Sequence, residues 1–260
     1  MIFRKLFRLV RVVLVFAYYI VEVIIRRPKT RALRAAWLSR LCKSLMRAAN
    51  ITVSVEGPIP TQGAVITNHL NLTDILAHSA VNPCVFISKM EVRKLPVMGW
   101  VSMMAGTLYV ERGAGGQAAK AAERMARDFR EGVPVVFFPE GTTGTGEVDL
   151  LPFRSGLIAQ TIMAKQPIYP GFLHYDLSAD DLARGLTTVK DLHWGTQPMG
   201  AHLWTLLGIK ATHCTIRFAS EPIAFTPAGL ANRKIAVVEA QAAVQALVMP
   251  LQSTPAPASR

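Results

Sequence analysis

The amino-acid sequence predicts an α/β fold: a mixed, mostly parallel sheet flanked by helices, with an N-terminal helical hairpin that associates with a membrane. Short β-branched runs alternate with helical stretches from residue 51 onward, which is the pattern of an α/β sheet. Twelve Lys or Arg residues but a single acid, Glu22, lie within the first 47 residues. The chain of 260 residues is long enough for one sizeable core plus an extension.

We expect one sheet domain at residues 51–252, followed by a flexible tail at residues 253–260. The strands are predicted at residues 51–55, 64–67, 85–88, 107–110, 133–138, 168–172 and 212–219. Helices are predicted at residues 116–131, 155–164, 199–207 and 232–248. Neither an internal repeat nor a second domain boundary interrupts this region.

The expected hairpin covers residues 1–50 and has two helical parts. The first, at residues 12–25, is apolar except for Glu22, but its length of about 21 Å is short of the ~30 Å hydrocarbon core of a bilayer. In the second, at residues 31–50, apolar residues recur every four positions and cations gather on another face, which suits a helix in the headgroup layer. We therefore expect re-entrant or interfacial anchoring. A cleaved signal peptide is disfavoured because no small-x-small site precedes Arg26.

Charge and cysteine usage indicate where the protein works. The formal net charge of +12 is concentrated at the N-terminal end, which favours contact with an anionic membrane surface. A nucleic-acid binder is disfavoured, because bulky aliphatic residues rather than base-stacking aromatics lie between these cations. Cys42, Cys84 and Cys214 match neither a metal site nor a disulfide framework, as expected for free thiols in a reducing compartment. We expect a peripheral or monotopic protein of the inner membrane, with its site facing the cytoplasm.

A histidine and an aspartate follow the predicted strand at residues 64–67. His69 and Asp74 lie five positions apart, at the sheet edge where open α/β folds bind ligands. A carboxylate that accepts the imidazole Nδ1 proton fixes the tautomer and leaves Nε2 to act as a base. The alternative is that His69 merely caps a turn.

Two further polar segments follow neighbouring strands. The strand at residues 133–138 opens into Glu140-Gly141-Thr142, and the strand at residues 107–110 is followed by Arg112. Because the carboxyl ends of parallel strands share one edge, we expect a base, a guanidinium and a Glu-Gly-Thr loop to converge on one rim of the sheet.

These segments resemble the four motifs of the glycerolipid (lysophosphatidate-type, 1-acylglycerol-3-phosphate) acyltransferase family. Asn68, His69 and Asp74 match its Asn-His-x4-Asp motif, and residues 138–142 and 167–170 are similar to its third and fourth motifs. The resemblance covers roughly residues 60–225. The second motif is similar to the run Lys89, Glu91, Leu95, Pro96, Gly99, Gly106 and Arg112.

The resemblance implies a reaction and a set of roles. His69 would deprotonate an acceptor hydroxyl, which attacks the thioester of an acyl carrier protein or of coenzyme A, and Asp74 would orient His69. No cofactor and no metal are implied. Phe86, Met98, Trp100, Met103 and Met104 would either line an acyl tunnel or belong to the core. The substrate-binding residues would be Asn68, Lys89, Arg112, Glu140, Gly141, Thr142 and Arg154.

The sequence departs from the family pattern at Thr143, a position that bears on the identity of the acyl acceptor. Phosphatidate-forming members commonly carry Arg or Lys where this chain has Thr143, and Arg154 would either replace that cation or simply begin a helix. We expect 1-acylglycerol-3-phosphate as acceptor, giving phosphatidate. The alternative is a lyso-ornithine lipid, because the Glu-Gly-Thr-Thr-Gly run and residues 193–195 and 202–204 are similar to that branch. A non-catalytic membrane lipid-binding protein on the same scaffold is the alternative of another class. The acyl chain length and the oligomeric state are left open.

Overall fold

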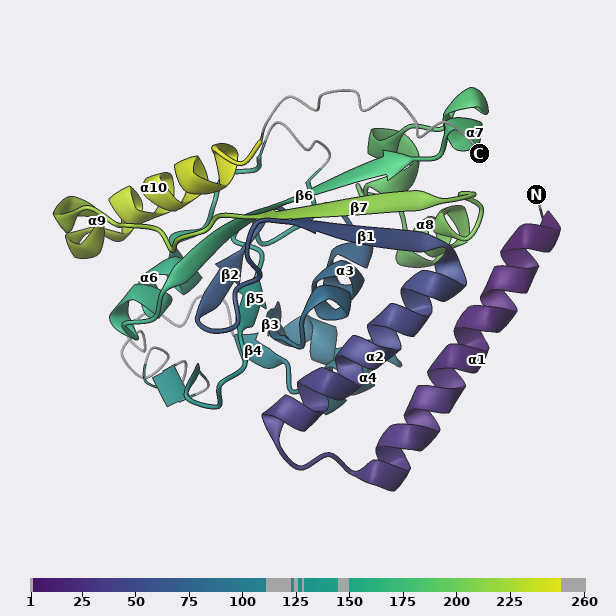
Figure 1. Ribbon diagram of the computed structural model, residues 1–260, viewed down its shortest axis with the longest axis horizontal. Helices are drawn as coiled ribbons and strands as arrows, with labels where there is room; N and C mark the ends of the chain where they lie inside the picture. The colour runs from purple at the N-terminus through teal and green to yellow at the C-terminus, as the bar shows by residue number, and fades with distance from the viewer. Residues whose placement is uncertain (1, 111–122, 124–125, 128, 145–149, 249–260) are drawn as a thin grey trace.

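A seven-stranded mixed sheet forms the centre of the computed structural model (Figure 1), which describes residues 2–110, 123, 126–127, 129–144 and 150–248. The strand order is β1-β7-β6-β2-β5-β3-β4. Only the β6–β7 pair is antiparallel among the described pairings, so the predicted mixed, mostly parallel sheet is confirmed. The strands are β1 (Ile51–Glu56), β2 (Ala64–Ile66), β3 (Val85–Lys89), β4 (Leu108–Val110), β5 (Val135–Phe137), β6 (Ile168–Leu177) and β7 (Thr212–Phe218).

The helices connect these strands and cover the sheet. Each predicted strand is present, and β6 is longer than expected because its second half pairs with β7. Most of the helix predicted at residues 116–131 lies outside the described residues. The described α-helices are α1 (Ile2–Arg26), α2 (Arg31–Ala49), α3 (Thr73–Val81), α4 (Met98–Met104), α6 (Ser155–Met163), α7 (Ala179–Ala183), α8 (Met199–Leu206), α9 (Pro227–Ala231) and α10 (Arg233–Gln245). A 3-10 turn, η1 (Met90–Lys94), and a π-turn, η2 (Thr188–Leu192), complete them.

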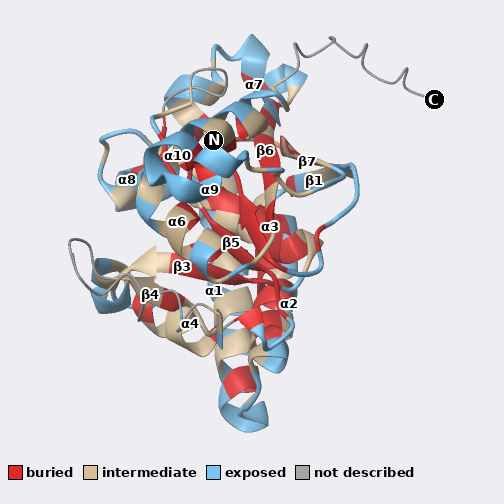
Figure 2. Ribbon diagram, turned by 90° about the vertical axis from the view of Figure 1, so that its left-hand side faces the viewer, coloured by how far each residue is buried: buried red, intermediate tan, exposed pale blue. Residues whose placement is uncertain are grey.

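Two hydrophobic clusters cover the two faces of the sheet. Successive side chains of a strand point to opposite faces, so in β2 Val65 belongs to the cluster with α2 and α3, whereas Ile66 belongs to the cluster with α6 and α10. Figure 2 shows the strands buried along much of their length. The three cysteines are unpaired and buried, as expected, and burial raises the pKa of the Cys42 thiol to about 12.

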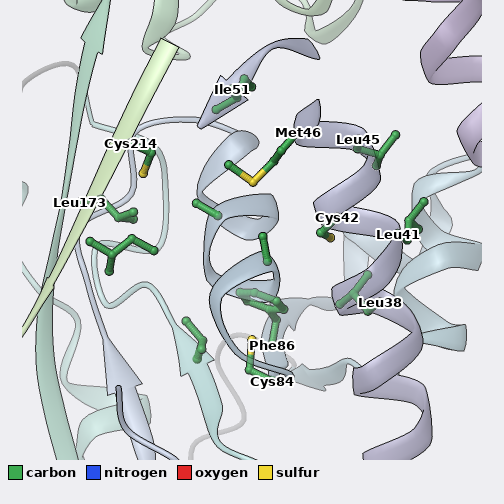
Figure 3. Packing of buried hydrophobic residues seen from close by; sticks show 14 of the residues in the cluster. Leu38, Leu41, Cys42, Leu45, Met46, Ile51, Cys84, Phe86, Leu173 and Cys214 are labelled. Atoms are coloured by element: carbon green, nitrogen blue, oxygen red, sulfur yellow. The ribbon is translucent and has the colours of Figure 1, made fainter. Parts of the chain in front are cut away.

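Helix α2 is a core element rather than a surface helix. Trp37, Leu41 and Leu45 are buried, and Figure 3 shows α2 side chains in one cluster with those of the sheet. The prediction that this helix lies in the headgroup layer is therefore wrong for its apolar stripe, which packs against protein. The division of the chain after residue 50 stays a prediction, although α2 contacts β1 across it. That residues 1–50 contact a membrane stays a proposal.

Helix α1 turns part of its basic face inward. Arg4 donates to the Gly208 carbonyl at 2.7 Å, and the buried Arg8 donates to the carbonyls of Ile209 and, at 2.5 Å, Lys210. These carbonyls belong to the segment that follows α8, and the two guanidinium groups supply donors to them. These two arginines hold α1 against the rest of the domain.

The outward face of α1 is apolar. No helix in the described part of the chain combines the length and the hydropathy needed to cross a bilayer. The exposed large side chains are Ile2, Phe3, Leu6, Phe7, Leu9, Val10, Val13, Leu14, Tyr18, Val21, Ile24 and Ile25. The buried Glu22 forms ion pairs with Arg26 and Arg40 at 3.0 and 2.9 Å, which ties α1 to α2.

Candidate active site

The polar motifs meet at the carboxyl edge of the parallel strands. His69 lies just beyond β2, Lys89 ends β3, and Glu140 lies just beyond β5, which is the neighbour of β2. The two loops are joined, because Gly144 N–H donates to the His69 carbonyl at 2.7 Å and His69 N–H donates to Glu140 Oε1 at 3.1 Å. Arg112, predicted for the same rim, lies outside the described residues.

His69 and Asp74 form a hydrogen-bonded pair. His69 Nδ1 lies 2.8 Å from Asp74 Oδ2, and the same oxygen accepts the backbone N–H groups of Leu70 and Asn71 at 2.6 and 3.0 Å. Asp74 is fully buried in the first turn of α3, whereas the His69 side chain is 18% exposed. The loop geometry follows from the sequence spacing, because an acid in the first helical turn faces free backbone N–H groups.

The imidazole is also fixed by stacking. The His69 and Phe138 rings lie 4.0 Å apart between centroids with an interplanar angle of 9°. Within the described residues, Nε2 forms no hydrogen bond, while His69 lines the adjoining cavity. Nδ1 is therefore committed to Asp74 and Nε2 is the ring nitrogen left for a substrate.

A tyrosine that the sequence reading missed completes the surroundings of Asp74. Tyr175 Oη donates to Asp74 Oδ1 at 2.8 Å from the second half of β6. The sequence does contain a signal for a longer strand, because the apolar or aromatic residues Leu173, Tyr175 and Leu177 alternate beyond the predicted end at residue 172. Its connection to a carboxylate 101 positions away is not visible in the sequence.

Asn68 does not face the cavity. It is fully buried, its Nδ2 donates to the Leu173 carbonyl at 2.9 Å, and its Oδ1 accepts the Leu173 N–H at 2.7 Å. The expected contact of Asn68 with substrate disagrees with this position, because both ends of the amide pair with β6. Asn68 instead holds the His69 loop against the strand.

Glu140 likewise acts on the loop backbone. Its carboxylate is 4% exposed and accepts backbone hydrogen bonds from His69 and Leu151. Burial raises the pKa of the Glu140 carboxyl to about 7, although the two backbone hydrogen bonds oppose the rise. Glu140 does not line the cavity, so the contact with an acceptor head group expected for it also disagrees with its position.

Arg154 begins a helix, which is one of the two alternatives that the sequence left open, whereas its replacement of the missing cation stays a prediction. It is the N-cap residue of α6, and its Nε donates to the Glu140 carbonyl at 3.3 Å. The guanidinium packs against Gly141, which has a φ of +70°, and a Cβ at that position would lie 2.8 Å from Arg154 Nε. Glycine is therefore needed both for the backbone conformation and for the close approach of the cation.

A cavity of about 1910 Å³ opens beside this edge. His69, Lys89 and Arg154 line its polar end together with Gly141, Thr142 and Thr143. Within the part of the chain that the structure describes, no Asp or Glu lines it. Of the expected tunnel residues, Phe86 and Met98 line the cavity, and the wall around them is apolar: Leu38, Leu41, Leu45, Ile75, Leu76, Val101, Ala105, Leu203 and Leu206.

A polar end with a free imidazole nitrogen and a long apolar wall suits the transfer of an apolar chain, and comparison with known proteins agrees. The family model described as Acyltransferase matches residues 21–173. The chain belongs to the acyltransferase family. That match begins inside α1 and ends inside β6.

Two relatives of this acyltransferase differ in the acceptor that their names give. It is 36% identical over 149 residues to a lyso-ornithine lipid O-acyltransferase of Pseudomonas aeruginosa, with 57% of this chain and 55% of the relative covered. It is 33% identical over 138 residues to a 1-acyl-sn-glycerol-3-phosphate acyltransferase of Neisseria gonorrhoeae, with 52% of this chain and 54% of the relative covered. The aligned part is thus about half of each relative's length.

The fold of this acyltransferase is similar to that of a solved structure. The crystal structure of the 1-acyl-sn-glycerophosphate acyltransferase of Thermotoga maritima superposes with a TM-score of 0.64 at 19% identity. The superposition covers 96% of this chain and 98% of that one.

Proposed function

We propose that this acyltransferase moves a fatty acyl group from a thioester to the hydroxyl of a lysolipid, with His69 as general base. The observation that carries the proposal is the His69–Asp74 pair, which leaves Nε2 without a partner among the described residues at the wall of an apolar cavity. Asp74 holds the imidazole in one tautomer and stabilises the imidazolium that forms during the reaction.

The reaction needs only one proton carrier. Nε2 takes the hydroxyl proton as the acceptor oxygen attacks the thioester carbonyl carbon, so a C–O bond forms. The C–S bond then breaks, and the thiolate receives the proton from the imidazolium. General-base assistance of this kind contributes about 10²–10⁴-fold. Holding both substrates beside the same imidazole supplies a further large factor.

The donor is the thioester of acyl carrier protein or coenzyme A. Its acyl chain would lie along the apolar wall formed by α2, α3 and α4, beside Phe86 and Val101. Ligand pockets usually measure ~300–1,000 Å³, so a cavity of about 1910 Å³ has room for the donor chain and part of the acceptor.

For the acceptor we propose 1-acylglycerol-3-phosphate, whose product is phosphatidate. Lys89 and Arg154 line the polar end of the cavity with His69, and no described lining residue is acidic. Such surroundings favour an anionic head group, and charge-assisted hydrogen bonds to phosphate are the strong ones. Thr142 and Gly141 would contribute further contacts at the same rim, and Arg112 is proposed to join them.

A lyso-ornithine lipid is the second candidate, because two specific observations favour it. The relatives from Pseudomonas aeruginosa and Rhodobacter capsulatus that are 36% and 35% identical are both lyso-ornithine lipid O-acyltransferases. Thr143 also stands where phosphatidate-forming members carry a cation. A single carboxylate, rather than a phosphate, would then meet Arg154.

We further propose monotopic attachment to the cytoplasmic face of the inner membrane through α1. The exposed face of α1 is apolar, the exposed Arg26 ends the helix, and the exposed Arg27 and Lys29 follow it. A helix with this distribution lies in the plane of the interface, with cations near anionic lipid. Flotation with phosphatidylglycerol vesicles tests this: Phe3→Glu combined with Phe7→Glu should abolish binding, whereas Leu230→Glu, another exposed position, should not.

The first experiment offers a labelled thioester with lysophosphatidate and with lyso-ornithine lipid separately. Transfer to lysophosphatidate supports the first candidate, and transfer only to the ornithine lipid replaces it by the second. His69→Ala should abolish transfer, while His213→Ala on β7, which bonds Thr52 and Ser54, should retain it. Lipid binding without any transfer by the wild-type protein would instead identify a non-catalytic lipid-binding protein.

A further inference from the structure

The second half of β6 contacts both ends of the loop at residues 68–74, which carries His69. β6 pairs with β2 only through residues 168–170, and from there it runs beyond the end of β2 while pairing with β7. Along this free stretch, the Leu173 backbone binds the Asn68 amide and the Tyr175 side chain reaches Asp74. Leu173, through its backbone, and Tyr175, through its side chain, therefore bind the two ends of the loop that carries His69.

The Tyr175 hydroxyl is placed to act as a permanent donor. Oη lies 2.8 Å from Asp74 Oδ1 and 2.9 Å from Thr73 Oγ1, and the residue is 1% exposed. Burial, and then the charge of Asp74, raise the pKa of the Tyr175 phenol well above its ordinary value. The phenol therefore keeps its proton at every pH at which the enzyme would work.

The two oxygens of Asp74 have different partners. Oδ2 faces His69 Nδ1 and the backbone N–H groups of Leu70 and Asn71, whereas the donor to Oδ1 among the described residues is Tyr175. A fully buried carboxylate needs donors on both oxygens. With donors on both oxygens, rotation of the carboxylate about its Cβ–Cγ bond would break these hydrogen bonds, which favours the orientation with Oδ2 directed at the imidazole.

We propose that Tyr175 is a positioning residue of the acyl-transfer reaction, whose hydroxyl orients the Asp74 carboxylate toward His69. The proposal rests on the proposed function, since it assigns Tyr175 a part in that reaction. Tyr175 does not itself line the cavity, so any effect of Tyr175 on the rate must pass through Asp74 and His69.

Loss of the Tyr175 hydroxyl should make the His69 imidazole easier to protonate. Asp74 would lose a donor, its carboxylate would attract protons more strongly, and the protonated form of the neighbouring imidazole would be favoured. The other titratable groups that face Asp74 are His78 of α3, Glu140 and Cys214 of β7, and none of these is altered. The pH at which kcat/KM reaches half its maximum should therefore rise.

Tyr175→Phe is the variant that tests this, and Tyr169→Phe on the same strand is the matched control. In Tyr175→Phe we expect kcat at neutral pH to fall about 10-fold or more and KM to change little. The acidic limb of the kcat/KM profile should move up by roughly half a pH unit to one unit. This is less than the ~1–2 units that loss of a hydrogen bond to a charged group produces at that group, because His69 feels the change only through Asp74. Unchanged kcat together with an unmoved acidic limb would overturn the proposal, whereas Tyr169→Phe should match the wild-type protein in both.

A second replacement covers the case in which Tyr175→Phe does not fold. 3-Fluorotyrosine at position 175 is nearly the same size and is a stronger donor, so the acidic limb should move to lower pH. An unmoved limb in this folded protein overturns the proposal.

An activity-free measurement separates this proposal from the proposed function. The rate of diethyl pyrocarbonate modification of His69, followed by peptide mass spectrometry across pH, should shift in the same direction as the acidic limb in each variant. If the wild-type protein transfers no acyl group to any lysolipid, the proposed function fails. The modification curve still decides whether Tyr175 acts on His69 through Asp74, and coincident curves for variant and wild type would sink that idea.

Discussion

Glu140→Gln tests whether a buried carboxyl that holds the His69 loop makes stability depend on pH. The Glu140 carboxyl is almost fully buried, and burial raises its pKa from 4.5 to about 7 against two opposing backbone hydrogen bonds. The folded protein therefore binds this proton more tightly than the unfolded chain. Its contribution to the free energy of unfolding falls as pH rises through the window from about 4.5 to about 7.

The size of the effect follows from the two pKa values. At ~1.4 kcal/mol per pH unit, a rise from 4.5 to about 7 corresponds to roughly 3 kcal/mol. Glutamine cannot ionise, so this loss should disappear in the variant. We expect the unfolding free energy of Glu140→Gln minus that of the wild-type protein to increase by up to about 3 kcal/mol between pH 4.5 and pH 8.

The comparison must be a difference between two proteins, because other groups titrate in the same window. Burial lowers the pKa of His78 and of His202 to about 4. These histidines are more readily protonated in the unfolded chain, so their contributions to stability rise with pH, opposite in sign to that of Glu140. Subtracting the wild-type curve removes both.

Urea denaturation followed by tryptophan fluorescence at four pH values gives the required free energies. Glu221→Gln, at an exposed position, is the matched control and should give a pH-independent difference. A pH-independent difference for Glu140→Gln as well would refute the reasoning. Glu140→Ala removes the acceptor for the His69 N–H altogether and should destabilise at every pH, by ~1–3 kcal/mol.

Three other predictions follow from the same geometry. Asp74→Asn keeps the shape but favours the wrong tautomer of His69, so kcat should fall by about 10³–10⁴-fold in steady-state acyl transfer with a small change in KM. Arg154→Gln removes a cation from the polar end of the cavity, so KM for an anionic lysolipid should rise about 10-fold, and an unchanged KM would exclude Arg154 from head-group binding. Arg8→Met removes the buried donor to the carbonyls of Ile209 and Lys210, so urea denaturation should show a free energy of unfolding lower by ~1–3 kcal/mol. Arg47→Met, at an exposed position, is the control and should not lower it.

The sequence by itself determined the features that depend on near neighbours. The α/β class and the seven strands follow from alternation and from β-branched runs, which are properties of a few consecutive residues. The His69–Asp74 contact also follows, because the two residues lie in one loop and Asp74 begins a helix. That the His69 and Glu-Gly-Thr loops share one edge also follows, because each loop comes directly after a strand predicted to be parallel.

Only the tertiary structure decided what covers each face and what lies next to a buried polar group. A four-residue apolar repeat shows that α2 has an apolar face, but it fits a lipid surface as well as a protein core, and here Trp37 and Leu41 meet protein. The inward turn of Arg8 depends on carbonyls about two hundred positions away. The hydrogen bond from Tyr175 to Asp74 forms only because β6 extends past the end of β2. That extension is set by the pairing of β6 with β7, which no local sequence pattern encodes.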